Sequence, residues 1–396
     1  MPEITLTLER SRRAYRIAVS CLFFLQGLCF ASWASRIPTI QQSLRLTEAG
    51  LGAVLFALPV GSLLGLPLAG WLVTRYGSKR VAVNALFFYS LVLVAVGLAD
   101  TVLLLSSALV LFGMAGNIAN IAINTQAVGV EARYERSIMA SFHGLWSLAG
   151  FTAAGIGSFM IANAIIPSSH FLMVAAFIVA GVATSFQFLL PGEASRTSSA
   201  PLFVKPDKPL LLLGIIAFCC MICEGAMFDW SGIYFQKVVK AEKSWIGAGY
   251  TAFMCTMAAG RFVADYVSHR IGFKKTIRLS GALIAMGLAI AVLFPSLYPS
   301  IAGFLLVGFG VSSVVPLVYS EAGRSRTFSP GMALAAVSSI GFLGFLAGPP
   351  LIGIIAGAFG LRTSFAVILV MGIAVSLMAG SIKKQSQTTN TVNHEK

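Results

Sequence analysis

Twelve long apolar runs constrain the fold of this chain more than any other feature of its sequence. Each is about 20 residues or longer, the length that a helix needs to cross the hydrocarbon core of a bilayer. They do not alternate apolar and polar side chains, as the strands of a membrane barrel do. We therefore expect an all-α, multi-pass membrane protein. The runs cover approximately residues 15–36, 48–74, 81–99, 101–129, 137–162, 169–190, 210–236, 245–267, 276–294, 298–321, 331–358 and 361–381.

Polar segments divide these runs into two sets of six. Hydrophobic residues make up 57% of the chain and charged residues only 11%, which is more apolar than a soluble domain. The clearest interruption is rich in Pro, Ser and charge. We expect five parts: a leader at 1–14, a six-helix bundle at 15–190, a linker at 191–209, a second six-helix bundle at 210–381 and a tail at 382–396.

The basic charge of the chain is a topology signal. The net charge is +14, and most of the 28 Lys and Arg residues fall in the termini and in loops that lie on the same side as the termini. Positive residues collect on the cytoplasmic side, so we expect leader, linker and tail in the cytoplasm. Nucleic acid is not an expected partner. All six cysteines fall within apolar runs, without the spacing of a disulfide framework or a zinc site.

The two halves look related to each other. Trp33 and Trp230 are separated by the same offset as Gly50 and Gly247. Glycine permits a tight turn, and basic residues hold it at the anionic cytoplasmic face. Two parallel six-helix repeats with the substrate between them are the plan of one large class of secondary transporters. Similar glycine-and-basic turns follow runs two and eight, with Gly70, Arg75, Gly77 and Arg80 in the first and Gly260, Arg261, Asp265, Arg270 and Gly272 in the second.

These paired turns resemble the signature loops of the major facilitator superfamily. Thr74 stands where the family usually has Asp, which implies that Asp265 carries the charge-relay role. More narrowly, the chain is similar to a bacterial inner-membrane branch, the MosC-like proteins, near the fucose–proton symporters. We expect a monomer. The residues that carry it are Ala31 to Pro38, His143-Gly144, Glu224-Gly225, Asp229-Trp230 and Gly348 to Gly353.

Two carboxylates lie inside a predicted span. Glu224 and Asp229 are the acidic residues, out of 14, that fall well within an apolar run. A charge at membrane depth is costly, and such residues usually mark an ion or substrate path. Either could instead be a neutral or paired packing residue. His143 is a candidate for a proton relay with Glu224, although a lone buried histidine is more often structural. We assign Glu224, Asp229 and His143 to proton coupling.

Amides and aromatics on two helix faces are candidates for solute binding. Asn117, Asn120 and Asn124 share one face of run four, and Gln26 and Trp33 share one face of run one. Amides donate and accept, which suits a hydroxylated ligand. The alternatives are hydrogen bonds between helices, packing, or for Trp33 the interfacial belt. Trp146 completes the substrate set. Arg36 either reaches the interface or pairs with Asp229.

These features predict a transporter rather than an enzyme. The sequence has no nucleotide-binding or metal-binding motif, and we expect no cofactor or metal. Our hypothesis is proton-coupled transport of a small polar solute, such as a sugar, polyol or inositol derivative, across the inner membrane. Run five lacks the Gly-Pro motif of drug–proton antiporters, which favours symport. Two alternatives stay open: proton-driven efflux of amphiphiles, and a membrane sensor or scaffold without transport.

Overall fold

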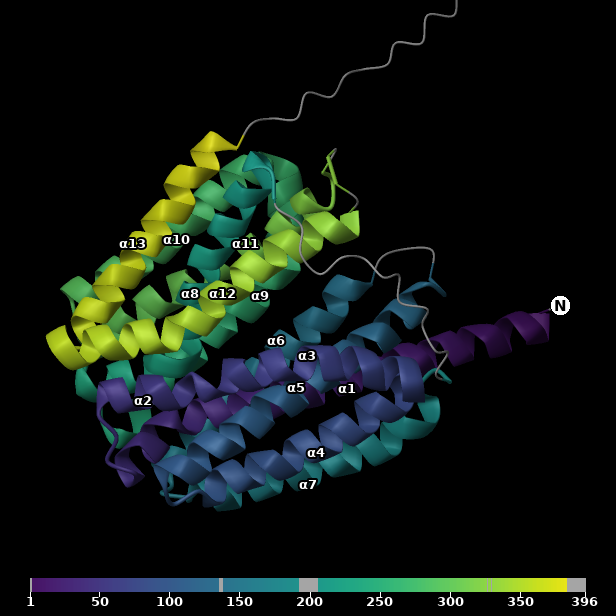
Figure 1. Ribbon diagram of the computed structural model, residues 1–396, viewed down its shortest axis with the longest axis horizontal. Helices are drawn as coiled ribbons and strands as arrows, with labels where there is room; N and C mark the ends of the chain where they lie inside the picture. Colours follow the sequence, from purple (N-terminus) through teal and green to yellow (C-terminus); the bar gives the residue numbers. More distant parts are fainter. Residues whose placement is uncertain (1, 135–137, 192–205, 326, 329, 383–396) are drawn as a thin grey trace, which may run out of the picture.

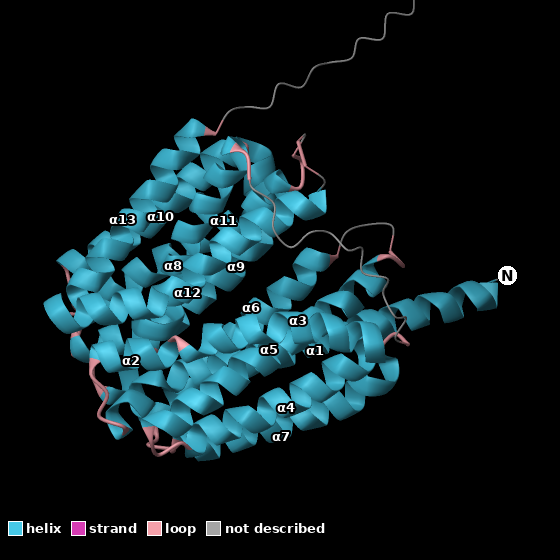
Figure 2. Cartoon of the chain, viewed as in Figure 1, coloured by secondary structure: helices cyan, strands magenta, loops and turns pink. Residues whose placement is uncertain are grey.

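Helices account for all the regular structure that is described. A computed structural model describes the chain except residues 1, 135–137, 192–205, 326, 329 and 383–396, and it has no strand in the described parts. Figure 2 shows short loops joining long helices. The elements are α1 (Pro2–Ser43), α2 (Glu48–Leu55), α3 (Ala57–Tyr76), α4 (Ser78–Leu98), α5 (Val102–Glu131), α6 (Met139–Ala162), α7 (Pro167–Ser185), η1 (Phe186–Phe188), α8 (Lys208–Lys237), η2 (Lys243–Trp245), α9 (Ala248–Ile271), α10 (Phe273–Leu293), α11 (Leu297–Ala322), α12 (Pro330–Phe359) and α13 (Leu361–Ser381).

The helices confirm the expected all-α membrane architecture. By length and composition, 11 helical segments of the described chain are able to cross a membrane, with α2 and α3 counted together as Glu48–Tyr76. The twelfth long helix, α9, is not among these segments; it carries Arg261, His269 and Arg270. Each of the twelve apolar runs therefore corresponds to a helix or to the α2–α3 pair.

Helices α1 to α7 form one bundle and α8 to α13 form the other (Figure 1). In the first, α3 packs on α5 and α1 packs on α6; in the second, α10 packs on α11 and α8 packs on α12. Between the bundles, α2 contacts α12, α6 contacts α9 and α1 contacts α8. The bundles diverge toward the end where α8 begins and α13 ends (Figure 1).

The helix ends differ from the expected segments at three places. Helix α1 begins at Pro2, so residues 2–14 continue this helix instead of forming a separate leader. The second run is interrupted at Phe56, because Pro59 has no N–H to donate to the carbonyl one turn earlier. Helix α8 begins at Lys208, where the Leu210 N–H donates to Asp207 Oδ1 at 3.0 Å. Most of the expected linker and tail lies outside the described residues.

Two glycines make equivalent turns in the two bundles. Gly77 joins α3 to α4 with a φ of 79°, and Gly272 joins α9 to α10 with a φ of 86°. With ψ near 150° as well, this conformation is essentially restricted to glycine, and a residue with a side chain would cost about 1–3 kcal/mol there. The glycines of the two paired turns are therefore explained by backbone geometry, as the sequence repeat predicts.

Close approach of two helix backbones requires glycine in the first bundle. A Cβ on Gly113 of α5 would collide with the Leu58 carbonyl oxygen of α3, and one on Gly61 would collide with the Val110 carbonyl oxygen. Small residues let helices pack at this distance inside a membrane. The reciprocal contacts hold α3 against α5.

Substituting alanine for Gly113 should therefore destabilise the protein. Backbone atoms block the added methyl group, so we expect the free energy of unfolding to fall by about 1–3 kcal/mol. The melting temperature in detergent measures this. Gly70→Ala is the matched control, because a Cβ at Gly70 of α3 meets no atom within 4 Å. Equal melting temperatures for the two variants would contradict this packing.

Candidate functional site

A cavity of 340 Å³ lies between the two bundles. Helices of both bundles contribute to its wall, so relative movement of the bundles would change its shape. Its polar lining includes side chains from α1, α5, α6, α8 and α9, and its apolar lining is largely aromatic. The lining residues that the argument below uses are Gln26, Phe30, Asn117, Asn120, His143, Trp146, Glu224, Phe228 and Arg261.

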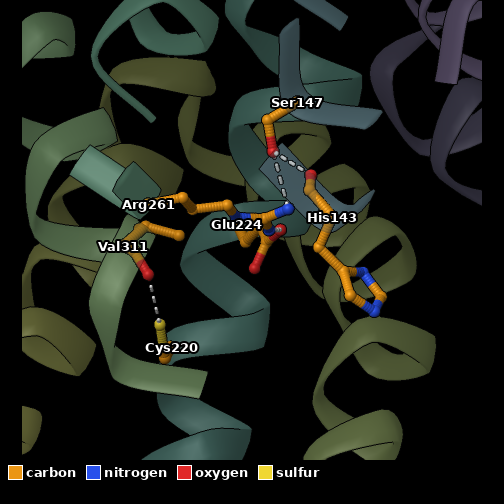
Figure 3. A network of polar contacts seen from close by, with 6 residues as sticks. All are labelled: His143, Ser147, Cys220, Glu224, Arg261 and Val311. Atoms are coloured by element: carbon orange, nitrogen blue, oxygen red, sulfur yellow. Dashed lines mark hydrogen bonds and ion pairs between the residues drawn. The ribbon is translucent and has the colours of Figure 1, made fainter. Parts of the chain in front are cut away.

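Arg261 and Glu224 form an ion pair in the wall of this cavity. Arg261 Nη2 of α9 lies 3.3 Å from Glu224 Oε1 of α8, and their side chains are 19% and 12% exposed. Arg261 Nη1 also donates to Ser147 Oγ of α6 at 2.8 Å. Ser147 Oγ in turn donates to the His143 carbonyl oxygen at 3.1 Å. Figure 3 shows the resulting connection from α8 through Arg261 to the other bundle.

The position of Arg261 corrects its expected assignment to a signature loop. It lies 11 residues before Gly272, which places it about 16 Å along the helix from the turn. Its guanidinium carbon is 5.8 Å from the centroid of the Trp146 ring, a cation–π contact across the bundles. The spacing in the sequence could have revealed this, because 11 residues are about three helical turns and place Arg261 well inside the predicted span.

Three aromatic rings form a surface beside this ion pair. Phe30 of α1, Trp146 of α6 and Phe228 of α8 have pairwise centroid distances between 5.4 and 6.3 Å. Trp146 was expected from the sequence, whereas Phe228 was not. Phe228 follows Glu224 by four residues on the same helix, so spacing alone would have placed both on one face.

Two amides in this region carry buried oxygens whose hydrogen-bonding capacity is unused. Gln26 Nε2 donates to the Gly116 carbonyl oxygen at 3.2 Å, and Gln26 Oε1 is buried without a partner among the described residues. Asn117 Oδ1 is likewise buried and unpartnered there. Asn120 also lines the cavity, but Asn124 does not, and its Nδ2 donates to Asn120 Oδ1 at 3.0 Å.

His143 lines the cavity without contacting the carboxylate. Its ring packs edge-on against Phe23, with centroids 5.2 Å apart. In Figure 3 the imidazole points away from Glu224, and the backbone carbonyl is the part that joins the polar network. No hydrogen bond joins His143 to Glu224 in the part of the chain that the structure describes. The direct relay that the sequence suggested is therefore absent from this geometry.

Three other candidates lie away from the cavity. Trp33 is 1% exposed and Asp229 is 8% exposed, and neither belongs to the cavity lining. Arg36 is 1% exposed and donates to the Ile165 carbonyl oxygen between α6 and α7. The proposed Arg36–Asp229 pair is not formed among the described side chains, because Arg36 turns into its own bundle. Trp33 is a buried side chain instead of an interfacial one.

The first signature turn lies at the ends of α3 and α4. Arg75, Gly77 and Arg80 are there, with Arg75 and Arg80 exposed, and Gly70 lies about two turns earlier in α3. Thr74, in the position where Asp was expected, donates its hydroxyl to the Gly70 carbonyl oxygen at 2.8 Å. It bonds back to its own helix instead of joining the turn to another element.

In the second bundle, the residues expected to form the signature turn lie at different places along α9. Gly260 packs against Ser312 of α11, and Gly272 makes the turn. The Arg270 guanidinium carbon is 5.3 Å from the centroid of the Tyr266 ring. The side chain of Asp265 lies outside the described part of the structure, so its expected relay role stays a prediction.

Comparison with known families decides the classification. The family model of the Major Facilitator Superfamily matches residues 19–326 and 244–395, two overlapping ranges that together take in nearly the whole chain. The chain belongs to the major facilitator superfamily. Superfamily members carry small molecules across membranes, and this one is accordingly a multi-pass membrane transporter.

Superfamily relatives match this chain along most of their length. It is 32% identical to an MFS-type transporter of Yersinia pestis over 93% of this chain and 96% of the relative. It is also 32% identical to membrane protein MosC of Rhizobium meliloti, over 91% of this chain and 88% of MosC. The crystal structure of the nucleoside transporter NupG has a TM-score of 0.79 at 12% identity, covering 93% of this chain and 100% of NupG, which shows a shared fold.

Proposed function

We propose that this superfamily member carries a small, polar, hydroxylated organic solute across the bacterial inner membrane, coupled to protons. The solute class is that of a sugar, a polyol or an inositol derivative. The observation that supports this most is the cavity between the bundles, which brings a carboxylate, a guanidinium and unpartnered amides against an aromatic surface. Such a combination suits orientation of a small hydroxylated ligand.

The solute would bind between Gln26, Asn117 and Asn120 on one side and the rings of Phe30, Trp146 and Phe228 on the other. Unpartnered amide oxygens accept hydrogen bonds from hydroxyl groups, and a buried polar atom without a partner is costly until a ligand supplies one. Glu224 is our candidate for the proton carrier, because it is the acidic residue in the described cavity lining.

We further propose that both termini face the cytoplasm. The charge distribution supports this orientation, because basic residues collect in the leader, linker and tail. The end at which the bundles contact each other would then face outward, and the end at which they diverge would face inward. One chain contains both bundles and the whole cavity, which is consistent with a monomer.

Transport would follow an alternation between two packings of the bundles. The solute and a proton enter while the outer end is open, the outer contacts form, and both leave at the cytoplasmic end. Superfamily transporters with two six-helix halves hold the substrate near mid-membrane and rock around it. The Arg261 bond to Ser147 would change during this movement because it joins different bundles, whereas the bond to Glu224 lies within the second bundle.

Solute flux in proteoliposomes tests this function. With the outside acidified, we expect accumulation of at least one radiolabelled solute from a panel of sugars, polyols, inositols and their acid derivatives. A protonophore should dissipate it, and empty liposomes are the control. Accumulation driven only by an acidic interior would indicate proton antiport instead. No flux in either direction, from protein that remains folded, would contradict transport and favour a sensor or scaffold.

A further inference from the structure

We propose that the transported solute carries a carboxylate, and that Arg261 binds it in place of Glu224. This inference rests on the proposed function and narrows its solute class to hydroxylated carboxylates, such as aldonates and uronates. The Arg261–Glu224 pair inside the cavity carries it. In this view the guanidinium is bound to Glu224 when the cavity is empty and to the solute when it is loaded.

The guanidinium is able to accept a second carboxylate. It has five N–H donors in a planar fork that matches a carboxylate with two parallel hydrogen bonds. Here Nη2 makes one contact of 3.3 Å to Glu224, and Nη1 donates to Ser147. Nε is buried without a partner among the described atoms. A single long contact and an unused donor leave room for a better-matched anion.

Charge balance then couples the solute to a proton. Arg261 and ionised Glu224 together carry no net charge, and they are the oppositely charged residues of the described cavity lining. A solute carboxylate would add one negative charge beside two largely buried charged side chains, which is costly if uncompensated. Protonation of Glu224 restores neutrality and frees the guanidinium for the solute. One carboxylate and one proton would therefore move together, with no net charge transferred.

The titratable groups around Glu224 are few. Cys220 and Cys223 lie within one turn of it on α8, Arg261 faces it from α9, and Tyr319 faces it from α11. His143 of α6 faces Arg261 from the other bundle. Arg261 is the cation in this set and the one with a donor left unused, so an incoming anion has a single clear partner.

The remaining lining indicates what is attached to the carboxylate. Gln26 Oε1 and Asn117 Oδ1 accept hydrogen bonds, which calls for hydroxyl groups on the solute. The Phe30, Trp146 and Phe228 rings supply an apolar wall for the C–H faces of a carbon chain or ring. A plain fatty acid would leave the amides unpartnered, and a neutral polyol would leave the guanidinium without a new ligand.

Matched pairs of solutes test the inference. D-Gluconate and D-glucitol have the same chain and differ at one terminal carbon, and D-glucuronate and D-glucose differ in the same way. In proteoliposomes with an acidic exterior, we expect uptake of gluconate, glucuronate or both, and much slower uptake of the neutral partners. An imposed membrane potential, set with potassium and valinomycin, should leave the acid uptake rate unchanged.

Each other result has a definite meaning. Uptake of the neutral members, alone or as fast as the acids, would overturn the inference and leave the proposed transport function standing. Acid uptake that speeds up with a negative interior would overturn the one-to-one charge balance. Uptake of none of the four, from protein that remains folded, would overturn the inference, while transport of another member of the wider solute panel would preserve the function.

Three variants separate a binding role for Arg261 from a structural one. Glu224→Gln should bind gluconate equally well above and below neutral pH, whereas the parent should bind it better at the lower pH. Arg261→Gln leaves Glu224 unpaired and should weaken gluconate binding by at least about 30-fold. The double variant E224Q/R261Q removes both charges, so it should fold like the parent and still fail to bind gluconate. Parent-like gluconate affinity in the folded double variant would overturn the proposal.

Discussion

Glutamine in place of Glu224 should abolish accumulation of the solute against its gradient while exchange continues. An amide cannot gain or lose a proton at this position, so loading of the solute no longer requires one. The side chain keeps its size and can still accept a hydrogen bond from Arg261. The bundles can therefore still rock with solute bound. Proteoliposomes with an acidic exterior should reach only equal solute concentrations inside and outside.

Asp229→Asn is the matched control for this prediction. Asp229 lies five residues further along α8 and is buried outside the cavity lining, at 8% exposure. We expect this variant to accumulate solute, because the carboxylate does not face the space that the solute crosses. The reverse pair of results, with accumulation lost in Asp229→Asn and kept in Glu224→Gln, would move proton coupling to Asp229.

Leucine in place of Gly52 should slow transport strongly by preventing closure of the end that we propose to face outward, called the outer end below. A Cβ on Gly52 of α2 would lie 2.8 Å from the Pro349 carbonyl oxygen and 2.9 Å from Gly353 Cα, both in α12. These are backbone atoms, so the helices themselves must separate. A cost of about 2 kcal/mol on the closed packing shifts the equilibrium between the two packings about 30-fold.

A cysteine at Thr251 reports whether the outer end has opened. Thr251 Oγ1 of α9 lies 3.2 Å from Ser158 Oγ of α6, across the closed contact between the bundles. Labelling by an impermeant maleimide should rise in the Gly52→Leu background, with the parent protein as the blank for native cysteines. Gly155→Leu is the control, because Gly155 of α6 is exposed and open space surrounds it. Unchanged labelling together with normal transport would contradict a gating contact at Gly52.

The outer contact combines close packing with one exposed ion pair. Lys237 Nζ of α8 lies 2.6 Å from Glu48 Oε1 of α2, with side chains 39% and 25% exposed. Exposed pairs of this kind contribute only about 0–1 kcal/mol to stability. The glycine contacts between α2 and α12 are therefore expected to decide how firmly the outer end closes. A weakly held contact is suitable for a step that must be reversed in every transport cycle.

Arg261 links the turn at Gly272 to the cavity between the bundles. The turn around Gly272 and the cavity residue Arg261 belong to one helix, so the Gly272 end of α9 and the proposed binding site would move as one body. The bond from Arg261 to Ser147 crosses to the other bundle. Breaking this bond when a solute carboxylate binds would loosen the bundles from each other, which is how binding could promote the conformational change.

The membrane architecture could be predicted from the sequence alone. Length and hydropathy suffice for this, because a backbone in hydrocarbon must satisfy its own hydrogen bonds and a helix does so locally. The paired turns were also predictable, since the positive φ at Gly77 and Gly272 is a local requirement that the residue type signals. The positions of Gln26, Asn117, Trp146 and Glu224 at the cavity could be anticipated for a related reason, because polar and amphipathic groups on an apolar helix are conspicuous.

Tertiary structure alone decided which polar residues share one space. Glu224 and Asp229 look alike in sequence, but a helix turns by about 100° per residue, so five residues place them on different faces. Arg36 and Arg261 both stand inside spans, and only the packing of neighbouring helices turns one into its own bundle and the other into the cavity. Hydropathy measures the favourable hydration free energy that a polar side chain loses when it leaves water. Which neighbour compensates that loss depends on helices distant in sequence, and only the folded chain brings them together.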